Sequence, residues 1–129
     1  MSTEQNKATL RRWMEGWNTR DVNVMEALAD ENSTTDYILH DPSLPGGSLV
    51  GIAAAKQWVR DVLKNAPDVR ITIEDLVAEG DKVASRFTVH GTDASTGKPV
   101  TTLVMAISRF VGDKVAEEWQ LAVTAETQT

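Results

Sequence analysis

The sequence of 129 residues contains no cysteine, so disulfide scaffolds, thiolate zinc sites and cysteine nucleophiles are excluded. Basic residues are also scarce: 13 lysines and arginines stand against 19 aspartates and glutamates, and the formal net charge is −6. No basic stretch is longer than Arg11-Arg12. Nucleic acids and anionic membranes attract clustered cations, and this composition therefore argues against both as partners.

Long apolar runs are missing as well. No segment approaches the roughly 20 apolar residues that span a bilayer, and residues 1–12 lack the apolar core of a signal peptide. We therefore expect a cytoplasmic location. The length and the 41% of apolar residues fit one globular domain over residues 1–129, with its core at about 6–123 and a frayed tail at 124–129.

The spacing of apolar residues predicts three helices and one strand in the first half of the chain. Ser2 and Gln5 form a capping box before a helix, and Asp21 is placed to cap a second helix. Pro67 and Asp68 end the third helix. The predicted segments are a helix at 3–17, a shorter helix at 22–29, a strand at 33–40 and a helix at 51–65.

After Pro67, apolar and polar residues alternate at period two with short turns between the runs. This pattern predicts an antiparallel meander of four strands, at 69–78, 82–92, 98–111 and 114–123. Helices gathered before a run of strands are typical of an α+β fold. We expect a curved sheet that wraps the helices and encloses a pocket.

Short motifs then occur in a characteristic order. They are Trp17-Asn18-Thr19-Arg20-Asp21, His40-Asp41-Pro42, Ala66-Pro67-Asp68-Val69-Arg70, Ala78-Glu79-Gly80-Asp81-Lys82-Val83, Gly91-Thr92, Thr96-Gly97-Lys98 and Glu117-Glu118-Trp119. With the order of elements, they resemble the SnoaL-like polyketide cyclase group of the nuclear transport factor 2-like superfamily, from about Leu10 to Trp119. The resemblance implies a cone-shaped roll of N-terminal helices packed in a strongly curved, mostly antiparallel sheet.

For function, the resemblance implies an enzyme that uses cofactor-independent acid–base chemistry of the isomerase, cyclase or dehydratase type. Its partner would be a small apolar or aromatic metabolite, and its state a homodimer. The chain departs from the cyclase group at Asp93, where the group usually has a histidine, and at Val123, where it usually has an acid. Both departures weigh against an aldol-type cyclase and favour the alternative of a non-catalytic ligand-binding or scaffold protein of the same fold.

Asp41 is the candidate catalytic residue. Its place before Pro42 resembles that of the general base in the steroid isomerases of the same superfamily. A carboxylate partly removed from water has a raised pKa and takes a proton from a carbon next to a carbonyl. The alternative is that Asp41 only caps the turn into Ser43. The enolate donors of the steroid isomerases correspond to Trp13 and Ala106, of which only Trp13 carries an N–H.

The other candidates are polar and aromatic side chains that either bind a ligand or have a structural role. Four of the seven aromatic residues are tryptophans, which suit a pocket wall as well as a core. Alternation places His40 and Asp41 on opposite faces, so at most one faces the pocket. The predicted ligand-binding residues are Trp13, Trp17, His40, Trp58, Arg86, His90 and Trp119. Two histidines without cysteine do not make a usual metal site, and we expect neither a metal nor a cofactor.

Three further interpretations concern the strands. Asp36, Asp41 and Arg86 are the residues that an epoxide hydrolase would need around a water. The adjacent Glu117 and Glu118 point to opposite faces, which makes them half solvated rather than a catalytic pair. Finally, a convex sheet face suits dimerisation; it would carry Thr101, Leu103, Met105, Ile107 and Val111.

Overall fold

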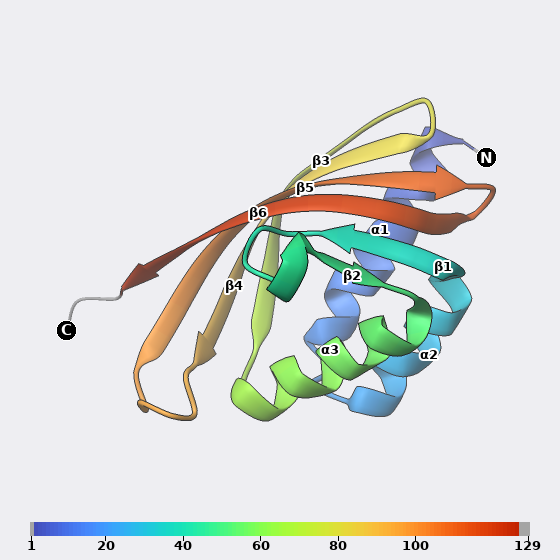
Figure 1. The fold of residues 1–129 in the computed structure, drawn as a ribbon. Helices are drawn as coiled ribbons and strands as arrows, with labels where there is room; N and C mark the ends of the chain where they lie inside the picture. The colour runs from blue at the N-terminus through green and yellow to red at the C-terminus, as the bar shows by residue number, and fades with distance from the viewer. Residues whose placement is uncertain (1, 127–129) are drawn as a thin grey trace.

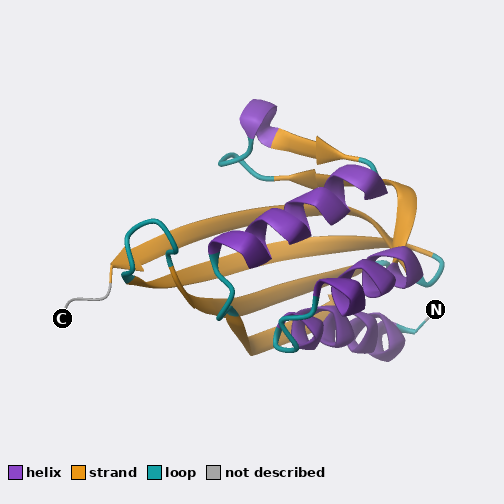
Figure 2. Cartoon of the chain, turned by 90° about the horizontal axis from the view of Figure 1, so that it is seen from below, coloured by secondary structure: helices purple, strands orange, loops and turns teal. Residues whose placement is uncertain are grey.

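The computed structural model describes residues 2–126, in which three helices lie against one face of a six-stranded sheet (Figures 1 and 2). The elements are α1 (Thr3–Trp17), α2 (Val22–Asn32), β1 (Ser33–His40), a 3-10 turn η1 (Pro45–Gly47), β2 (Ser48–Val50), α3 (Ile52–Asn65), β3 (Arg70–Glu79), β4 (Lys82–Thr92), β5 (Pro99–Val111) and β6 (Lys114–Glu126). The predicted α+β class is confirmed, and the three predicted helices and five predicted strands all form.

The first two helices begin where their caps require. The Ser2 hydroxyl accepts a hydrogen bond from the Gln5 backbone N–H, and the Gln5 side chain accepts one from the Ser2 backbone N–H. The Asp21 carboxylate accepts a bond from the Asn23 N–H at 2.9 Å and starts α2. Gly16 allows α1 and α2 to pack closely, because a Cβ at this position would lie 2.5 Å from Leu28 Cδ1.

The strands are arranged in the order β2-β1-β6-β5-β4-β3. The predicted meander of β3 to β6 is present, and each of its strands is antiparallel to the next. β1 joins this meander at its last strand and runs parallel to β6, with Leu39 paired to Glu118 and His40 paired to Trp119. Three details differ from the sequence prediction: α2 continues to Asn32, β6 continues to Glu126, and the loop after Asp41 contains the short strand β2.

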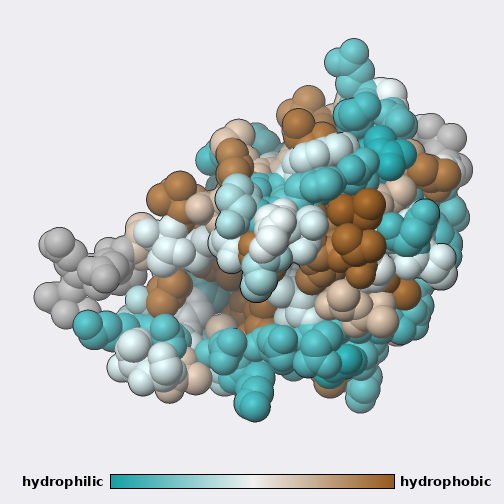
Figure 3. All heavy atoms as spheres, in the orientation of Figure 1, coloured by the Kyte–Doolittle hydropathy of each residue, from teal (hydrophilic) through white to brown (hydrophobic). Residues whose placement is uncertain are grey.

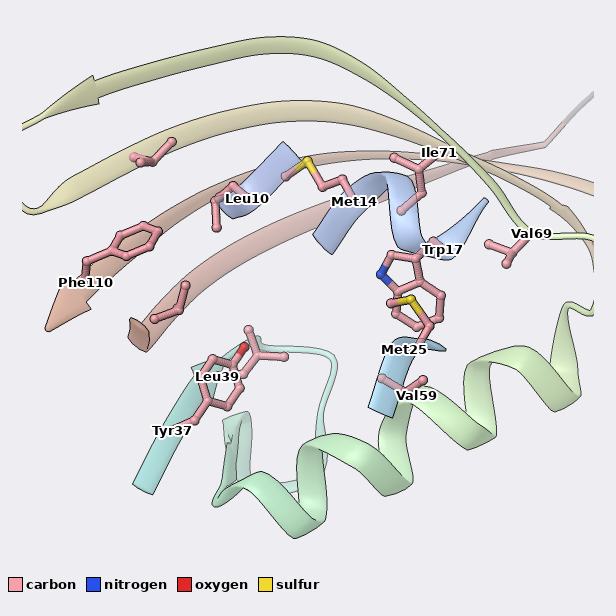
Figure 4. Packing of buried hydrophobic residues seen from close by; sticks show 12 residues of the cluster. Leu10, Met14, Trp17, Met25, Tyr37, Leu39, Val59, Val69, Ile71 and Phe110 are labelled. Atoms are coloured by element: carbon pink, nitrogen blue, oxygen red, sulfur yellow. The ribbon is translucent and has the colours of Figure 1, made fainter. Parts of the chain in front are cut away.

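One face of the curved sheet, the inner face, packs against the helices and carries the core. Trp17 of α1 lies beside Met25 of α2, with Val59 of α3 below and Ile71 of β3 above (Figure 4). All four side chains are buried. The predicted amphipathic helices are therefore joined to the sheet through one continuous cluster of apolar side chains.

The opposite, outer face of the sheet carries apolar side chains that no described residue covers. We call them the apolar strip: Leu103, Met105, Ile107 and Val111 of β5 with Leu121 and Val123 of β6. Leu121 keeps 66% of its surface exposed and Val123 keeps 67%. In the described part of the chain, no helix has the length and apolar character that crossing a membrane requires.

Candidate functional site

A cavity of about 430 Å³ lies between the inner face of the sheet and the helices. The surface is hollowed above α3, and apolar atoms are visible in the hollow (Figure 3). The aromatic side chains in the cavity wall are Trp13, Trp17, Tyr37, Trp58 and Phe87. Two carboxyl groups, those of Asp41 and Glu118, also line it. The cavity is therefore mainly apolar and contains two acids.

Asp41 is placed in this cavity by the end of β1. Leu39 points inward and His40 outward, so the next residue faces inward again, and Asp41 is only 6% exposed. Its Oδ2 accepts a hydrogen bond from the Gln120 amide at 2.7 Å. Its Oδ1 accepts bonds from the backbone N–H and the hydroxyl of Ser43, both at 2.8 Å. Asp41 therefore caps the turn and lines the cavity at the same time.

These contacts determine the charge of Asp41. Burial raises its pKa, but the hydrogen bonds from Gln120 and Ser43 stabilise the carboxylate and together lower the pKa below its ordinary value. The raised pKa that the base hypothesis assumed is therefore absent, and the alternative of a cap on the turn into Ser43 applies; only the Gln120 donor, from a distant strand, is beyond what sequence alternation reveals. At neutral pH Asp41 is a carboxylate.

Glu118 is the second carboxyl group of the cavity, and sequence reasoning missed it. It is half-buried on the inner face of β6, where it lines the cavity next to Tyr37 and Ser108. The Tyr37 hydroxyl donates to Oε1 at 2.5 Å, and the Ser108 hydroxyl donates to Oε2. Burial raises the pKa of Glu118, and the two hydrogen bonds only partly offset this rise.

The strand position of Glu118 does not by itself identify it. Alternation correctly separated Glu117 from Glu118, but counting in twos from the buried Val115 would turn Glu117 inward; a bulge between the pairs Phe110–Val115 and Arg109–Glu117 shifts the alternation, so that Glu118 points inward instead. Only the neighbouring strands, however, show that the inward side is enclosed. Ser108 of β5 pairs directly with Glu118, and Tyr37 comes from β1, far away in the sequence.

Three of the four predicted tryptophans meet at the cavity. Trp13 and Trp17 are one turn apart on α1, and their rings make an edge contact with centroids 5.8 Å apart. Trp17 makes a second edge contact with Trp58 of α3, at 5.9 Å. Trp17 is buried in the core, whereas Trp13 and Trp58 are half-buried. The two interpretations of these residues, core and pocket wall, therefore both apply.

The remaining predicted binding residues do not reach this cavity. His40, Arg86, His90 and Trp119 are all on the outer face. The His40 ring stacks on Trp119 with centroids 5.4 Å apart and contacts Glu117 at 2.7 Å. Strand alternation is the physical reason, because each of these residues is one position away from an inward-facing neighbour. His40, Arg86 and Trp119 instead border an open groove on the outer face, whose lining also includes Asp41, whereas His90 lines neither this groove nor the cavity.

The structure also separates the residues of the other candidate sites from one another. Asp36 is exposed, and Arg86 binds Asp75 on the outer face, so the epoxide-hydrolase arrangement with Asp41 does not form. Val123, where the cyclase group usually has an acid, is on the outer face, and Asp93 caps the β4–β5 turn through Ser95. Among residues 2–126, no three histidine, aspartate or glutamate side chains gather as a metal site would require.

Comparison with known proteins agrees with this architecture. The SnoaL-like domain family matches residues 10–118, and the chain belongs to this family. No curated protein sequence matches the chain. The family assignment confirms the resemblance seen in the sequence.

Solved structures with the same fold include three proposed polyketide cyclases. The SnoaL-like protein of Jannaschia sp. CCS1 has 20% identity and a TM-score of 0.82, covering 93% of this chain and 86% of its own. IdmH of Streptomyces antibioticus has 23% identity and a TM-score of 0.77, covering 92% and 91%. The Bacillus cereus protein has 26% identity and a TM-score of 0.74, covering 95% and 78%. These similarities show the fold.

Proposed function

We propose that this protein is a small-molecule enzyme that works by cofactor-independent acid–base chemistry in the cavity, with Asp41 as the base. The observation that carries the proposal is an ionised carboxylate in the wall of a mainly apolar cavity. The family and its structural neighbours support an enzyme of the isomerase, cyclase or dehydratase type. The substrate would be a mostly apolar metabolite held by Trp13, Trp17 and Trp58.

The environment of Asp41 limits the chemistry that it performs. A carboxylate with a lowered pKa is deprotonated at neutral pH and can accept a proton, but it is a weaker base than a carboxylate with a raised pKa. It therefore suits an acidic C–H, such as a carbon between a carbonyl and an aromatic ring. The Gln120 amide holds the carboxylate in place on the inner face. The indole N–H of Trp13 is a donor of the kind that an enolate oxygen needs.

This reaction is tested without knowing the natural substrate. The probe is 2-tetralone in D₂O, and NMR follows the loss of its benzylic hydrogens. We expect wild-type protein to accelerate exchange and Asp41→Asn to reduce the acceleration at least about 100-fold, the usual contribution of a positioned base. Asp36→Asn is the matched control on the same strand, because Asp36 is exposed to solvent. An equal rate in the Asp41 variant would remove Asp41 from the mechanism.

A non-catalytic ligand-binding protein is the second candidate, and the hydrogen bonds of Asp41 favour it. Three donors already occupy the carboxylate and give it a structural role in the turn. This candidate predicts that 2-tetralone quenches the fluorescence of the cavity tryptophans to saturation while its hydrogens exchange no faster than in buffer. Quenching and exchange, measured on the same sample, therefore separate the two functions.

We also propose that the protein is a homodimer in the cytoplasm. The apolar strip supports the dimer, because contiguous exposed apolar side chains on a sheet favour contact with a second copy. The cytoplasmic location is the expectation from the sequence. Sedimentation at micromolar concentration tests the oligomeric state, and a monomer there would overturn the dimer.

A further inference from the structure

Glu118 is an enclosed carboxyl group whose hydrogen-bond partners are all neutral. Its two oxygens accept bonds from the hydroxyls of Tyr37 and Ser108. Within residues 2–126, the wall of the cavity contains no lysine, arginine or histidine. A buried carboxylate without a positive partner is unfavourable, and proteins usually pair such a group. The cavity therefore has an unbalanced negative charge whenever Glu118 is ionised.

The hydrogen bonds around Glu118 are nevertheless arranged for the carboxylate. Burial and the neighbouring Glu118 raise the pKa of Tyr37, so its hydroxyl stays protonated and donates a hydrogen bond to Glu118. Ser108 is fully buried and also donates. A carboxylate has about four acceptor sites, so acceptor capacity remains after these two bonds. Glu118 lines the cavity, and the remaining capacity is available to a donor there.

The nearest basic groups on β6 and its neighbours cannot serve Glu118. Arg109 and His40 contact Glu117, on the outer face of the sheet. The backbone of β6 separates them from Glu118, since adjacent strand residues point in opposite directions. The described residues around the cavity therefore offer the Glu118 carboxylate no positive partner, and a ligand in the cavity is the remaining source of one.

The helix side of the cavity also suits a cation. Trp13 and Trp58 each lie nearly perpendicular to Trp17, at 77° and 86°, so the three indoles form a corner. All three line the same cavity as Glu118 and Asp41. Indole faces carry negative electrostatic potential, and such groups of rings bind ammonium ions. The tryptophan rings and the carboxyl groups of this cavity thus both favour a positively charged ligand.

We infer that the ligand of this cavity carries a positively charged nitrogen on an apolar body, and that the Glu118 carboxylate and the tryptophan corner receive it. This inference rests on the proposed function in using its cavity, but it does not require Asp41 to act as a base. It names the substrate class as organic amines or ammonium compounds. Glu118 then binds the positively charged nitrogen of the ligand, and the role of Asp41 as a base is a separate question.

Binding of a cation is linked to the protonation of Glu118. Below its pKa, Glu118 is protonated in the free protein, and a cation favours the carboxylate, so the proton passes to solvent. The affinity for a cation should therefore rise with pH up to the pKa of Glu118 and level off above it. The affinity for a neutral ligand of the same shape should not follow this curve.

The probes are 3-hydroxyphenyltrimethylammonium and 3-tert-butylphenol, which have the same shape and differ in charge. Quenching of tryptophan fluorescence measures both affinities on the full chain. We expect the cation to bind at least about tenfold more tightly, because the cation–π contacts and the Glu118 carboxylate both favour a positive charge. In Glu118→Gln this preference should fall several-fold and its pH dependence should be lost, whereas binding of the phenol is unchanged.

Glu117→Gln is the matched control, because it makes the same chemical change one residue away on the outer face, and it should keep the preference. Tyr37→Phe is a second variant that removes one donor to the carboxylate and should reduce the preference. Equal affinities in wild type, an unchanged preference in Glu118→Gln, or no binding of either probe would overturn the inference. Exchange of 2-tetralone fails or succeeds independently of these results, so the two proposals are separable.

Discussion

Glu117 and Glu118 are consecutive residues with opposite environments. Glu117 is on the outer face of β6, where hydrogen bonds from His40 and Arg109 outweigh its partial desolvation and lower its pKa. Glu118 is on the inner face, where burial outweighs the bonds from Ser108 and Tyr37 and raises its pKa. The difference shows that the two faces of this sheet provide different electrostatic environments. Carboxyl groups on the inner face are enclosed and partly removed from water, whereas those on the outer face are close to solvent and to basic side chains.

The first prediction compares one leucine from each face. Leu39 of β1 is 3% exposed in the core, and Leu121 of β6 is 66% exposed on the apolar strip. Leu39→Ala should lower the free energy of unfolding by about 2–5 kcal/mol, since it leaves a hole in packed surroundings. Leu121→Ala should change it by less than about 0.5 kcal/mol when the protein is monomeric. Urea unfolding measures both, and similar losses would contradict the distinction between the faces.

The second prediction concerns association through the outer face. Leu121→Lys places a charge in the middle of the apolar strip. If the strip is a dimer interface, the association constant should fall at least about 100-fold, because a buried unpaired charge costs about 3 kcal/mol or more. Sedimentation equilibrium measures the change, with Lys114→Gln at the end of the same strand as the control. A wild-type dimer that tolerates Leu121→Lys would place the interface elsewhere.

The third prediction uses the pH dependence of stability, which should have opposite signs for the two glutamates. The raised pKa of Glu118 means that the folded state holds the proton more tightly than the unfolded chain. Wild-type stability should therefore fall as pH rises from 4.5 through the raised pKa, by about 1.4 kcal/mol per pH unit within that interval. Glu118→Gln should lack this loss.

For Glu117 the sign is reversed. Its pKa is lowered in the folded state, so its contribution is present above 4.5 and is lost as pH falls through the folded-state pKa. Glu117→Gln should remove that loss on the acid side and leave the alkaline side unchanged. Urea unfolding over a pH series measures both variants. Parallel curves for the two variants would mean that the faces do not differ as described.

Much of this arrangement could be predicted from local sequence. Ser2, Gln5 and Asp21 set the helix starts through bonds within three residues, and period-two alternation set the meander. Alternation also separated His40 from Asp41 correctly. These features depend on neighbours in the chain, and the sequence contains that information directly.

The remaining features depend on contacts between distant residues. The parallel pairing of β1 with β6 brings Tyr37 to Glu118 and Gln120 to Asp41, across 81 and 79 residues. The Gln120 contact helps to lower the pKa of Asp41, and the burial that raises the pKa of Glu118 also comes from strands distant in the sequence, so no local pattern signals either contribution. For the same reason His40, Arg86, His90 and Trp119 were assigned to the pocket: alternation defines two faces, but the packing of the helices decides which face is enclosed.

The most direct test of the account is the carboxyl titration of the two adjacent glutamates. Carbon-13 NMR of the wild-type protein, with Glu117→Gln and Glu118→Gln to assign the signals, measures both pKa values in one experiment. The account predicts a value above 4.5 for Glu118 and below 4.5 for Glu117. A Glu118 pKa at or below 4.5 would show that water solvates this carboxyl group on the inner face. Such a value would contradict the enclosed site on which both proposals depend.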